Sequence, residues 1–206
     1  MITLRLMEEA TPTVGLRERK RVRTRRAIAD AALELFEVHG FHATTIPQVA
    51  AAADVSPRTV SGYFPAKEDL AFPDADERIT ALEQCLRTRP AGETTAEALR
   101  RWLPEMLAGD AHRAVEHRRR RTVIDADDDL CAYEHRYMAR AQAALTDAFA
   151  ADLGAGPDAL EPRMAASATV TVFELLGRDL DPAESPLAAL DRALVFIGGG
   201  IGALRA

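Results

Sequence analysis

Residues 45–65 constrain the fold of this chain most strongly, because they carry two helix-start patterns close together. Thr45 is placed to cap a helix whose first turn contains Pro47, and Gln48 is positioned to complete a capping box. Ser56 and the proline after it repeat the pattern of a cap followed by a first-turn proline. The segment therefore predicts two short helices in immediate succession.

The residues between the two caps indicate how these helices pack. Ile46, Val49 and Ala50 recur at helical spacing, which predicts one buried face, and the small residues 50–53 allow close approach of a second helix. Asp54 lies where the chain must turn sharply, and aspartate tolerates the left-handed backbone conformation better than most residues. We interpret the segment as a helix-turn-helix that binds DNA.

The wider pattern over residues 22–70 resembles the TetR-type transcriptional regulators. The residues that carry this resemblance are Gly40-Phe41, Thr44-Thr45, Val49-Ala50, Ala53-Asp54-Val55-Ser56, Thr59, Tyr63-Phe64, Lys67-Glu68 and Leu70. The sequences SPRT and YFPAKEDL are similar to a subgroup that regulates fatty-acid, acyl-CoA and mycofactocin-linked genes. The resemblance implies an all-α protein with an N-terminal three-helix DNA-binding domain and a larger helical domain for ligand binding and dimerisation.

Positive charge is concentrated near the start of the chain, although the formal net charge is -6. The basic residues of this run are Arg17, Arg19, Lys20, Arg21, Arg23, Arg25 and Arg26, and Glu18 is the single acid among them. Binding to DNA depends on where charge lies rather than on its sum. We predict that residues 1–21 form a flexible basic arm that follows phosphates or enters the minor groove; the alternative is a solvated helix entry.

The resemblance also implies individual DNA contacts. Phosphate contacts are expected from Thr45, Tyr63 and Lys67, and from backbone N–H groups at the start of a helix after Pro65. Arg58 is the long donor on the second helix and is expected to read a guanine. The full set of predicted DNA-binding residues is Thr45, Arg58, Thr59, Ser61, Gly62, Tyr63, Lys67, Arg23 and Arg25.

Two of these positions, Ser61 and Gly62, depart from the residues that family members often carry there. This departure predicts that specificity shifts to Arg58 and the basic arm. Thr59 either contacts DNA or serves as an internal helix residue, and both interpretations remain open. The departure also supports an alternative function, in which the chain is a helical ligand-binding partner protein with weakened or lost DNA recognition.

The rest of the chain predicts helices and no strand. A supporting helix is expected over residues 27–38, and further helices at about 74–87, 94–108, 110–124, 127–153, 158–179 and 185–203. We therefore divide the chain into an arm (1–21), a DNA-binding domain (22–70) and a helical domain (71–206). The last two helices are the most apolar and suit the interface of a symmetric homodimer, which would hold two DNA half-sites at fixed spacing.

The resemblance implies a ligand pocket among the middle helices. Its candidate residues are Trp102, Met106, His117, Arg120, Tyr133, Tyr137 and Phe173, and core packing is the alternative for each apolar member. The run His117–Arg121 is either a set of salt-linked, solvated side chains or an anion site for a phosphate-bearing ligand such as a CoA thioester.

Other classes of protein find little support in the sequence. There is no motif for a nucleophile, a phosphate loop or a metal site, so we expect no enzyme activity, cofactor or metal. Cys85 and Cys131 lack the spacing of a redox pair or metal site, and no apolar run has the length of a membrane span. We expect a cytoplasmic repressor that leaves a palindromic operator when a small apolar or anionic effector binds.

Overall fold

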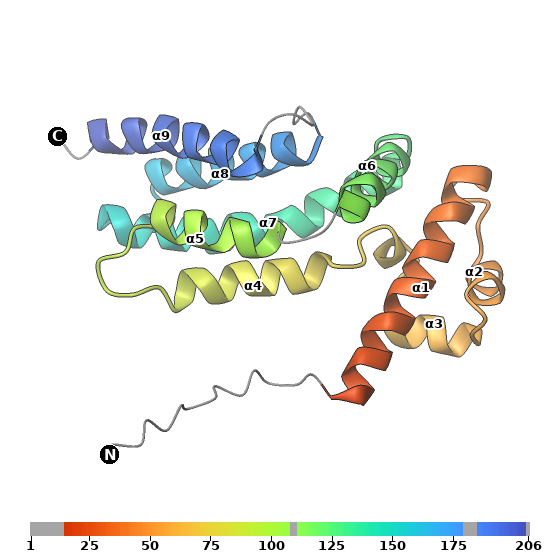
Figure 1. Ribbon diagram of the computed structural model, residues 1–206. Coiled ribbons are helices and arrows are strands. Elements are labelled where there is room, and N and C mark those ends of the chain that lie inside the picture. The colour runs from red at the N-terminus through yellow and green to blue at the C-terminus, as the bar shows by residue number, and fades with distance from the viewer. Residues whose placement is uncertain (1–14, 108–110, 179–184, 205–206) are drawn as a thin grey trace, which may run out of the picture.

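The computed structural model describes residues 15–107, 111–178 and 185–204. A head of three helices, α1 (Leu16–His39), α2 (Ile46–Ala52) and α3 (Pro57–Tyr63), lies beside a larger helical body (Figure 1). The body contains α4 (Ala75–Arg87), α5 (Thr95–Leu107), α6 (Ala111–Asp125), α7 (Asp128–Leu153), α8 (Leu160–Arg178) and α9 (Pro186–Leu204). The described ranges contain no strand, which confirms the all-α prediction. Within these ranges, no helix is long and apolar enough to cross a membrane.

The predicted capping patterns set the starts of α2 and α3. The Thr45 hydroxyl accepts a hydrogen bond from the backbone N–H of Gln48, whose side-chain oxygen accepts one from the Thr45 backbone N–H at 2.8 Å. The Ser56 hydroxyl accepts from the backbone N–H of Thr59 at 3.0 Å. Asp54 adopts a φ of 52°, in the left-handed region that the tight turn requires.

The core of the head draws on residues from outside the predicted 22–70 domain. Most of its largest fully buried side chains come from α1 to α3 and the segment just after them, namely Ile28, Leu33, Val49, Val60, Phe64 and Leu70. Val123 and Ile124 of α6 and Leu130 of α7 belong to the same buried cluster. The boundary drawn at residues 70 and 71 therefore divides one continuous core.

Two predicted segments near the head are corrected by the structure. Helix α1 begins at Leu16 rather than near residue 27, so residues 16–21 are helical and do not form a flexible arm. Arginine, lysine, glutamate and leucine are all good helix formers, which explains the extension. After Pro65 there is only a short 3-10 helix, Glu68–Leu70, because Pro73 prevents a regular helix from continuing and α4 starts at Ala75.

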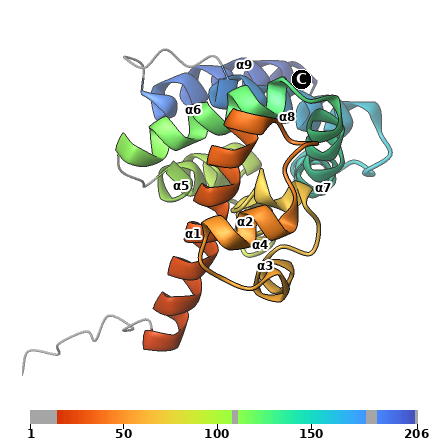
Figure 2. The same ribbon diagram turned by 90° about the vertical axis from the view of Figure 1, so that its right-hand side faces the viewer.

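Helix α4 runs from the head along the body (Figure 1). Its apolar residues Ile79, Leu82 and Leu86 enter a core shared with α5, α7, α8 and α9. Helix α6 lies beside α1 in both views (Figures 1 and 2), and ion pairs between the two helices join body to head. The head is therefore attached to the body through both α4 and α6.

Candidate nucleic-acid interface

Helix α3 presents a small exposed surface with a single long donor. Arg58, Ser61 and Gly62 are exposed, whereas Thr59 is half-buried and its hydroxyl lies 2.8 Å from the Ser56 hydroxyl. Thr59 thus takes part in the cap of α3 through its hydrogen bonds with Ser56, a role that neither prediction named. Arg58 therefore dominates the hydrogen-bonding capacity of the exposed side of α3.

At the start of α2, the side chain of Thr45, which was expected to contact phosphate, is already hydrogen-bonded within the capping box. The Thr45 hydroxyl lies 2.8 Å from the side-chain oxygen of Gln48, to which it donates. It must give up this hydrogen bond before it can donate to a phosphate oxygen. The amide NH₂ of Gln48 is a donor at the same helix end, and sequence reasoning assigned Gln48 only to the capping box.

Lys67 is held against the head by its neighbours. Its ammonium lies 4.2 Å from the centre of the Phe41 ring and donates to the backbone oxygen of His42 at 3.4 Å. Partial burial lowers the pKa of Lys67, and the charges of Glu68 and Asp127 act in the opposite direction. Phe41 thus supports Lys67 as well as filling the core, where it is packed edge-on against Phe36.

One backbone donor of the predicted phosphate site after Pro65 is already used within the chain. The backbone N–H of Ala66 donates to the Asp69 carboxylate at 2.8 Å, so this donor already has an anionic partner within the chain. The other oxygen of Asp69 accepts from the Tyr133 hydroxyl at 2.5 Å. Asp69 thereby links the end of the head to α7.

Arg25 also has a structural position rather than the predicted DNA-contacting one. Its guanidinium donates to the backbone oxygen of Tyr63 at 2.9 Å and to that of Pro73 at 3.1 and 2.7 Å. The same group lies 4.6 Å from the centre of the Phe64 ring. The guanidinium fork is directed into the junction between α1, the end of α3 and the start of α4, and not outward toward DNA.

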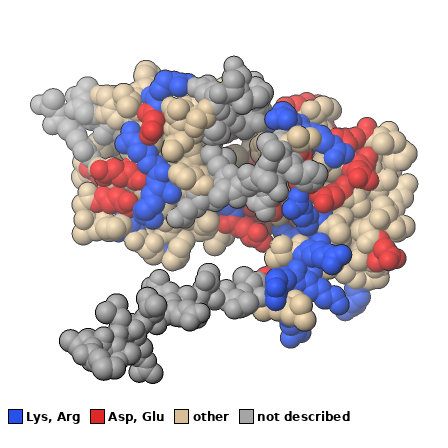
Figure 3. Space-filling view, in the orientation of Figure 1, with Lys and Arg blue, Asp and Glu red and all other residues tan. Residues whose placement is uncertain are grey.

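The basic residues that precede Arg25 are exposed along the first half of α1. They are Arg17, Arg19, Lys20, Arg21 and Arg23. In Figure 3, blue side chains gather around the N-terminal end of α1, at the lower right of the molecule. Since an α-helix rises about 1.5 Å per residue, residues 17–23 place positive charge over a span of about 9 Å beside the helix-turn-helix. Arg21 lies 3.9 Å from Glu18, an exposed pair that contributes little stability.

The arginines of the run His117–Arg121 tie α6 to the rest of the protein. Arg119 pairs with Glu37, Arg120 donates to the backbone oxygen of Leu70 at 3.1 Å, and Arg121 pairs with Glu134 at 2.6 Å. His117 and Arg118 are exposed, whereas Arg119 and Arg121 are held in ion pairs. The run therefore agrees better with salt-linked side chains than with an open anion site. Desolvation of the His117 imidazole by the surrounding protein nevertheless lowers its pKa, and the positive charges of the neighbouring arginines lower it further.

The predicted pocket residues fall into two groups. Trp102 and Phe173 pack in the body core with ring centroids 5.8 Å apart, which favours the core-packing alternative for both. Tyr133 and Tyr137 stack on Phe72 near the junction of head and body, with centroid distances of 5.7 and 6.4 Å. The Tyr137 hydroxyl is buried and has no hydrogen-bond partner among the described residues. The side chain of Met106 lies outside the described residues.

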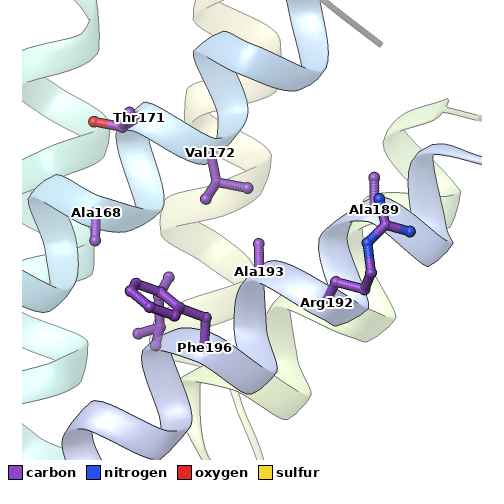
Figure 4. Close-up of a pocket in the computed structure, with 8 residues that line it drawn as sticks. Ala168, Thr171, Val172, Ala189, Arg192, Ala193 and Phe196 are labelled. Atoms are coloured by element: carbon purple, nitrogen blue, oxygen red, sulfur yellow. The ribbon is translucent and has the colours of Figure 1, made fainter. Parts of the chain in front are cut away.

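A hollow with a volume of about 490 Å³ lies away from these residues, between α8 and α9. Figure 4 shows side chains from both helices around it, including Val172 on α8 and Arg192 and Phe196 on α9. It does not coincide with the predicted pocket among the middle helices. Its apolar wall belongs to the two helices that were predicted to form a dimer interface.

Comparison with known proteins identifies the head. Residues 28–72 match the family of bacterial regulatory proteins described as the tetR family. This part of the head carries a tetR-family domain. TcmR from Streptomyces glaucescens, described as an HTH-type transcriptional regulator, is 41% identical to this chain over 85 residues, which are 41% of this chain and 38% of TcmR. The putative mycofactocin biosynthesis regulator MftR from Mycobacterium tuberculosis is 30% identical over 115 residues, covering 56% of this chain and 58% of MftR.

The aligned segments thus span less than two thirds of these relatives. Solved structures extend the likeness of fold to most of the chain. GusR from Salmonella enterica superimposes with a TM-score of 0.59 at 22% identity, covering 88% of this chain and 96% of GusR. FadR from Bacillus subtilis, solved with stearoyl-CoA, gives a TM-score of 0.50 at 21% identity, covering 85% of this chain and 98% of FadR. At these identities the likeness shows the arrangement of the helices alone.

Proposed function

We propose that this chain is a DNA-binding transcriptional regulator that recognises a palindromic operator as a homodimer. The observation that carries the proposal is a tetR-family helix-turn-helix with an exposed Arg58 on α3, together with a row of exposed basic residues on the first half of α1. Arg58 supplies contacts to base edges, and the α1 residues neutralise phosphates. The phosphate contacts fix the register of the head on the duplex.

Dimerisation through α8 and α9 is supported by apolar side chains that the single chain leaves exposed. On α8 these are Leu160, Met164 and Leu175, and on α9 they are Leu187, Val195 and Phe196. Phe196 is 82% exposed, an extreme value for a phenylalanine. Burying these side chains against a second copy would place two heads on one duplex, which a single short recognition helix requires for useful specificity.

The heads of a dimer can take positions that fit the operator or positions that do not. A small molecule that binds the body with different affinity in these two states would control the affinity for DNA. The junction of Phe72, Tyr133 and Tyr137 supports such a role, because Tyr133 is bonded to Asp69 at the end of the head and Tyr137 has a buried hydroxyl that no described residue pairs with. A repressor that an effector releases from DNA is the form of regulation that we propose. An acyl-CoA is one effector class to test, since FadR was solved with stearoyl-CoA.

Selection of bound duplexes from a random DNA pool, with the purified full chain, tests the proposed function. Enrichment of a palindromic site would support a dimeric regulator. If no sequence is enriched at low salt, the proposal fails, and the alternative is a helical ligand-binding protein that has lost DNA recognition. This alternative is tested because Ser61 and Gly62, although exposed, offer few side-chain groups for contacts to bases.

The effector is tested separately by thermal unfolding with acyl-CoA thioesters, free fatty acids and lipophilic drugs. A ligand that binds only the folded state raises the midpoint of unfolding. A CoA thioester that stabilises the protein and also releases the selected duplex would support the proposed class. Stabilisation by an uncharged compound alone would contradict an anionic effector.

A further inference from the structure

Three side chains that the DNA-binding proposal does not use meet between the head and the start of α7. His42 lies in the loop between α1 and α2, and Asp127 and Asp129 lie at the beginning of α7. The imidazole Nε2 of His42 is 3.3 Å from Oδ2 of Asp127 and 3.7 Å from Oδ2 of Asp129. Taking one ligand atom from each of the three residues, all three lie within 4.8 Å of one another.

The geometry points to a binding site for a divalent transition-metal ion of the Zn²⁺ class at His42, Asp127 and Asp129. Imidazole nitrogen and carboxylate oxygen bind Zn²⁺ at about 2.0–2.2 Å in tetrahedral sites, so that neighbouring ligand atoms lie about 3.3–3.5 Å apart. The two distances from His42 Nε2 are close to this spacing. A water molecule would complete the coordination from the solvent side, where His42 and Asp129 are both exposed.

Asp127 is held in a position suited to a metal ligand. Its Oδ1 accepts hydrogen bonds from the backbone N–H groups of Asp129 and Leu130, both at 3.1 Å, while Oδ2 faces His42. The Asp127 side chain is only 11% exposed, so its orientation is fixed by its surroundings. Such hydrogen bonds to a ligating carboxylate orient it toward the ion.

The ring of His42 is also supported by its surroundings. It packs edge-on against Phe41, with centroids 5.4 Å apart and an interplanar angle of 68°. Two carboxylates converge on one ring nitrogen, and a single N–H at Nε2 cannot donate a full hydrogen bond to both. An ion at their centre would satisfy both carboxylates and use the lone pair of a neutral imidazole.

The charges around the cluster favour a cation. Asp127 and Asp129 contribute two negative charges, which outweigh the one ammonium of Lys67 that interacts with Asp127. His42 belongs to the head, whereas the two aspartates belong to α7 of the body. A bound ion would therefore join head to body and stabilise the folded chain as its concentration rises.

The test is a titration of the full chain, free of any polyhistidine tag, with Zn²⁺ in competition with a fluorescent chelator. We expect one ion per chain that the variants His42→Gln and Asp129→Asn each weaken by about tenfold or more. His39→Gln and Asp128→Asn are matched controls, because both residues are exposed neighbours outside the cluster. The controls are expected to keep the affinity of the wild type.

Thermal unfolding gives a second readout with the same variants. At a Zn²⁺ concentration that saturates only the wild-type site, the ion should raise the midpoint of the wild type and of both controls by more than that of His42→Gln and Asp129→Asn. Mg²⁺, which prefers six oxygen ligands, should have no comparable effect. Equal Zn²⁺ affinity in wild type and cluster variants, or equal loss in the controls, would overturn the site. Because no DNA is present, failure here leaves the proposed DNA-binding function unaffected.

Discussion

At the scale of single residues, two arginines of the head differ in what their guanidinium groups face. Arg58 is exposed on α3, whereas Arg25 donates to backbone oxygens at the junction of head and body. The sequence pattern placed both in the DNA-binding set. Exposure and hydrogen bonding separate a residue that can read bases from one that holds the head in place.

For Arg58, the change to alanine should relax specificity at one base pair of each half-site. Loss of a bidentate hydrogen-bonded pair with guanine costs about 1–3 kcal/mol of discrimination. The measurement is a titration against the selected site and against sites with single base changes. Arg87→Ala, at an exposed position at the end of α4, serves as control and should leave both affinity and discrimination unchanged. Unaltered discrimination in Arg58→Ala would remove this residue from base recognition.

For Arg25, the change to alanine should lower the free energy of unfolding by about 2–3 kcal/mol, because it removes hydrogen bonds from a charged donor to the Tyr63 and Pro73 oxygens. Arg25→Lys should recover only part of this stability, since a single ammonium cannot reproduce the guanidinium fork. Urea unfolding checks both variants. Arg23→Ala is the neighbouring control and should change stability by no more than about 0.5 kcal/mol. Equal stability of Arg25→Ala and Arg23→Ala would contradict the structural role.

At the scale of elements, local patterns predicted much of the structure. The caps at Thr45 and Ser56 placed α2 and α3, and apolar periodicity placed α4 to α9 to within a few residues. Local patterns did not locate the ion pairs of α6 or the meeting of His42 with Asp127, because those residues are far apart in the sequence. The tertiary fold brings them together.

Because the basic residues near the start of the chain lie on a helix, they are expected to contact phosphates as a rigid element and not as a flexible arm. A helix holds its charges at fixed positions, whereas a flexible arm must be ordered on binding at a cost in entropy. Replacing Arg17 and Lys20 with glutamine should preserve the helix, since glutamine has a similar helix propensity. Operator affinity should fall for all sequences alike.

The measurement for this double variant is the slope of log affinity against log salt concentration. The slope should become shallower by about 0.9 for each phosphate that the variant no longer neutralises. Arg87→Gln combined with Arg163→Gln removes the same number of charges from the body and should leave the slope unchanged. If both double variants gave the wild-type slope, the first half of α1 would not contact phosphates.

At the scale of the whole molecule, α8 and α9 form the face through which we propose that two copies of the chain dimerise. Sequence reasoning predicted this face from its apolar content, and the structure adds that large apolar side chains on it are exposed in the single chain. The arrangement of a second copy could not be derived from residue patterns, because it depends on the shape of the whole face.

Phe196→Glu should therefore weaken dimerisation at least tenfold, because it places a charge where about 1.5–3 kcal/mol of apolar burial is expected from each phenylalanine. Sedimentation or light scattering over a range of concentrations would show the shift toward monomer. Val115→Glu, on the exposed side of α6, is the control and should dimerise as the wild type does. A wild-type dimerisation constant in Phe196→Glu would place the interface elsewhere.

The central claim is that two protomers bind one palindromic duplex, each through α3 and the first half of α1. The most direct measurement is native mass spectrometry of the full chain titrated into the selected duplex and into a duplex with one half-site scrambled. We expect a complex of two protomers with the intact site and a marked loss of affinity when one half-site is scrambled. A single protomer bound with equal affinity to both duplexes would contradict it.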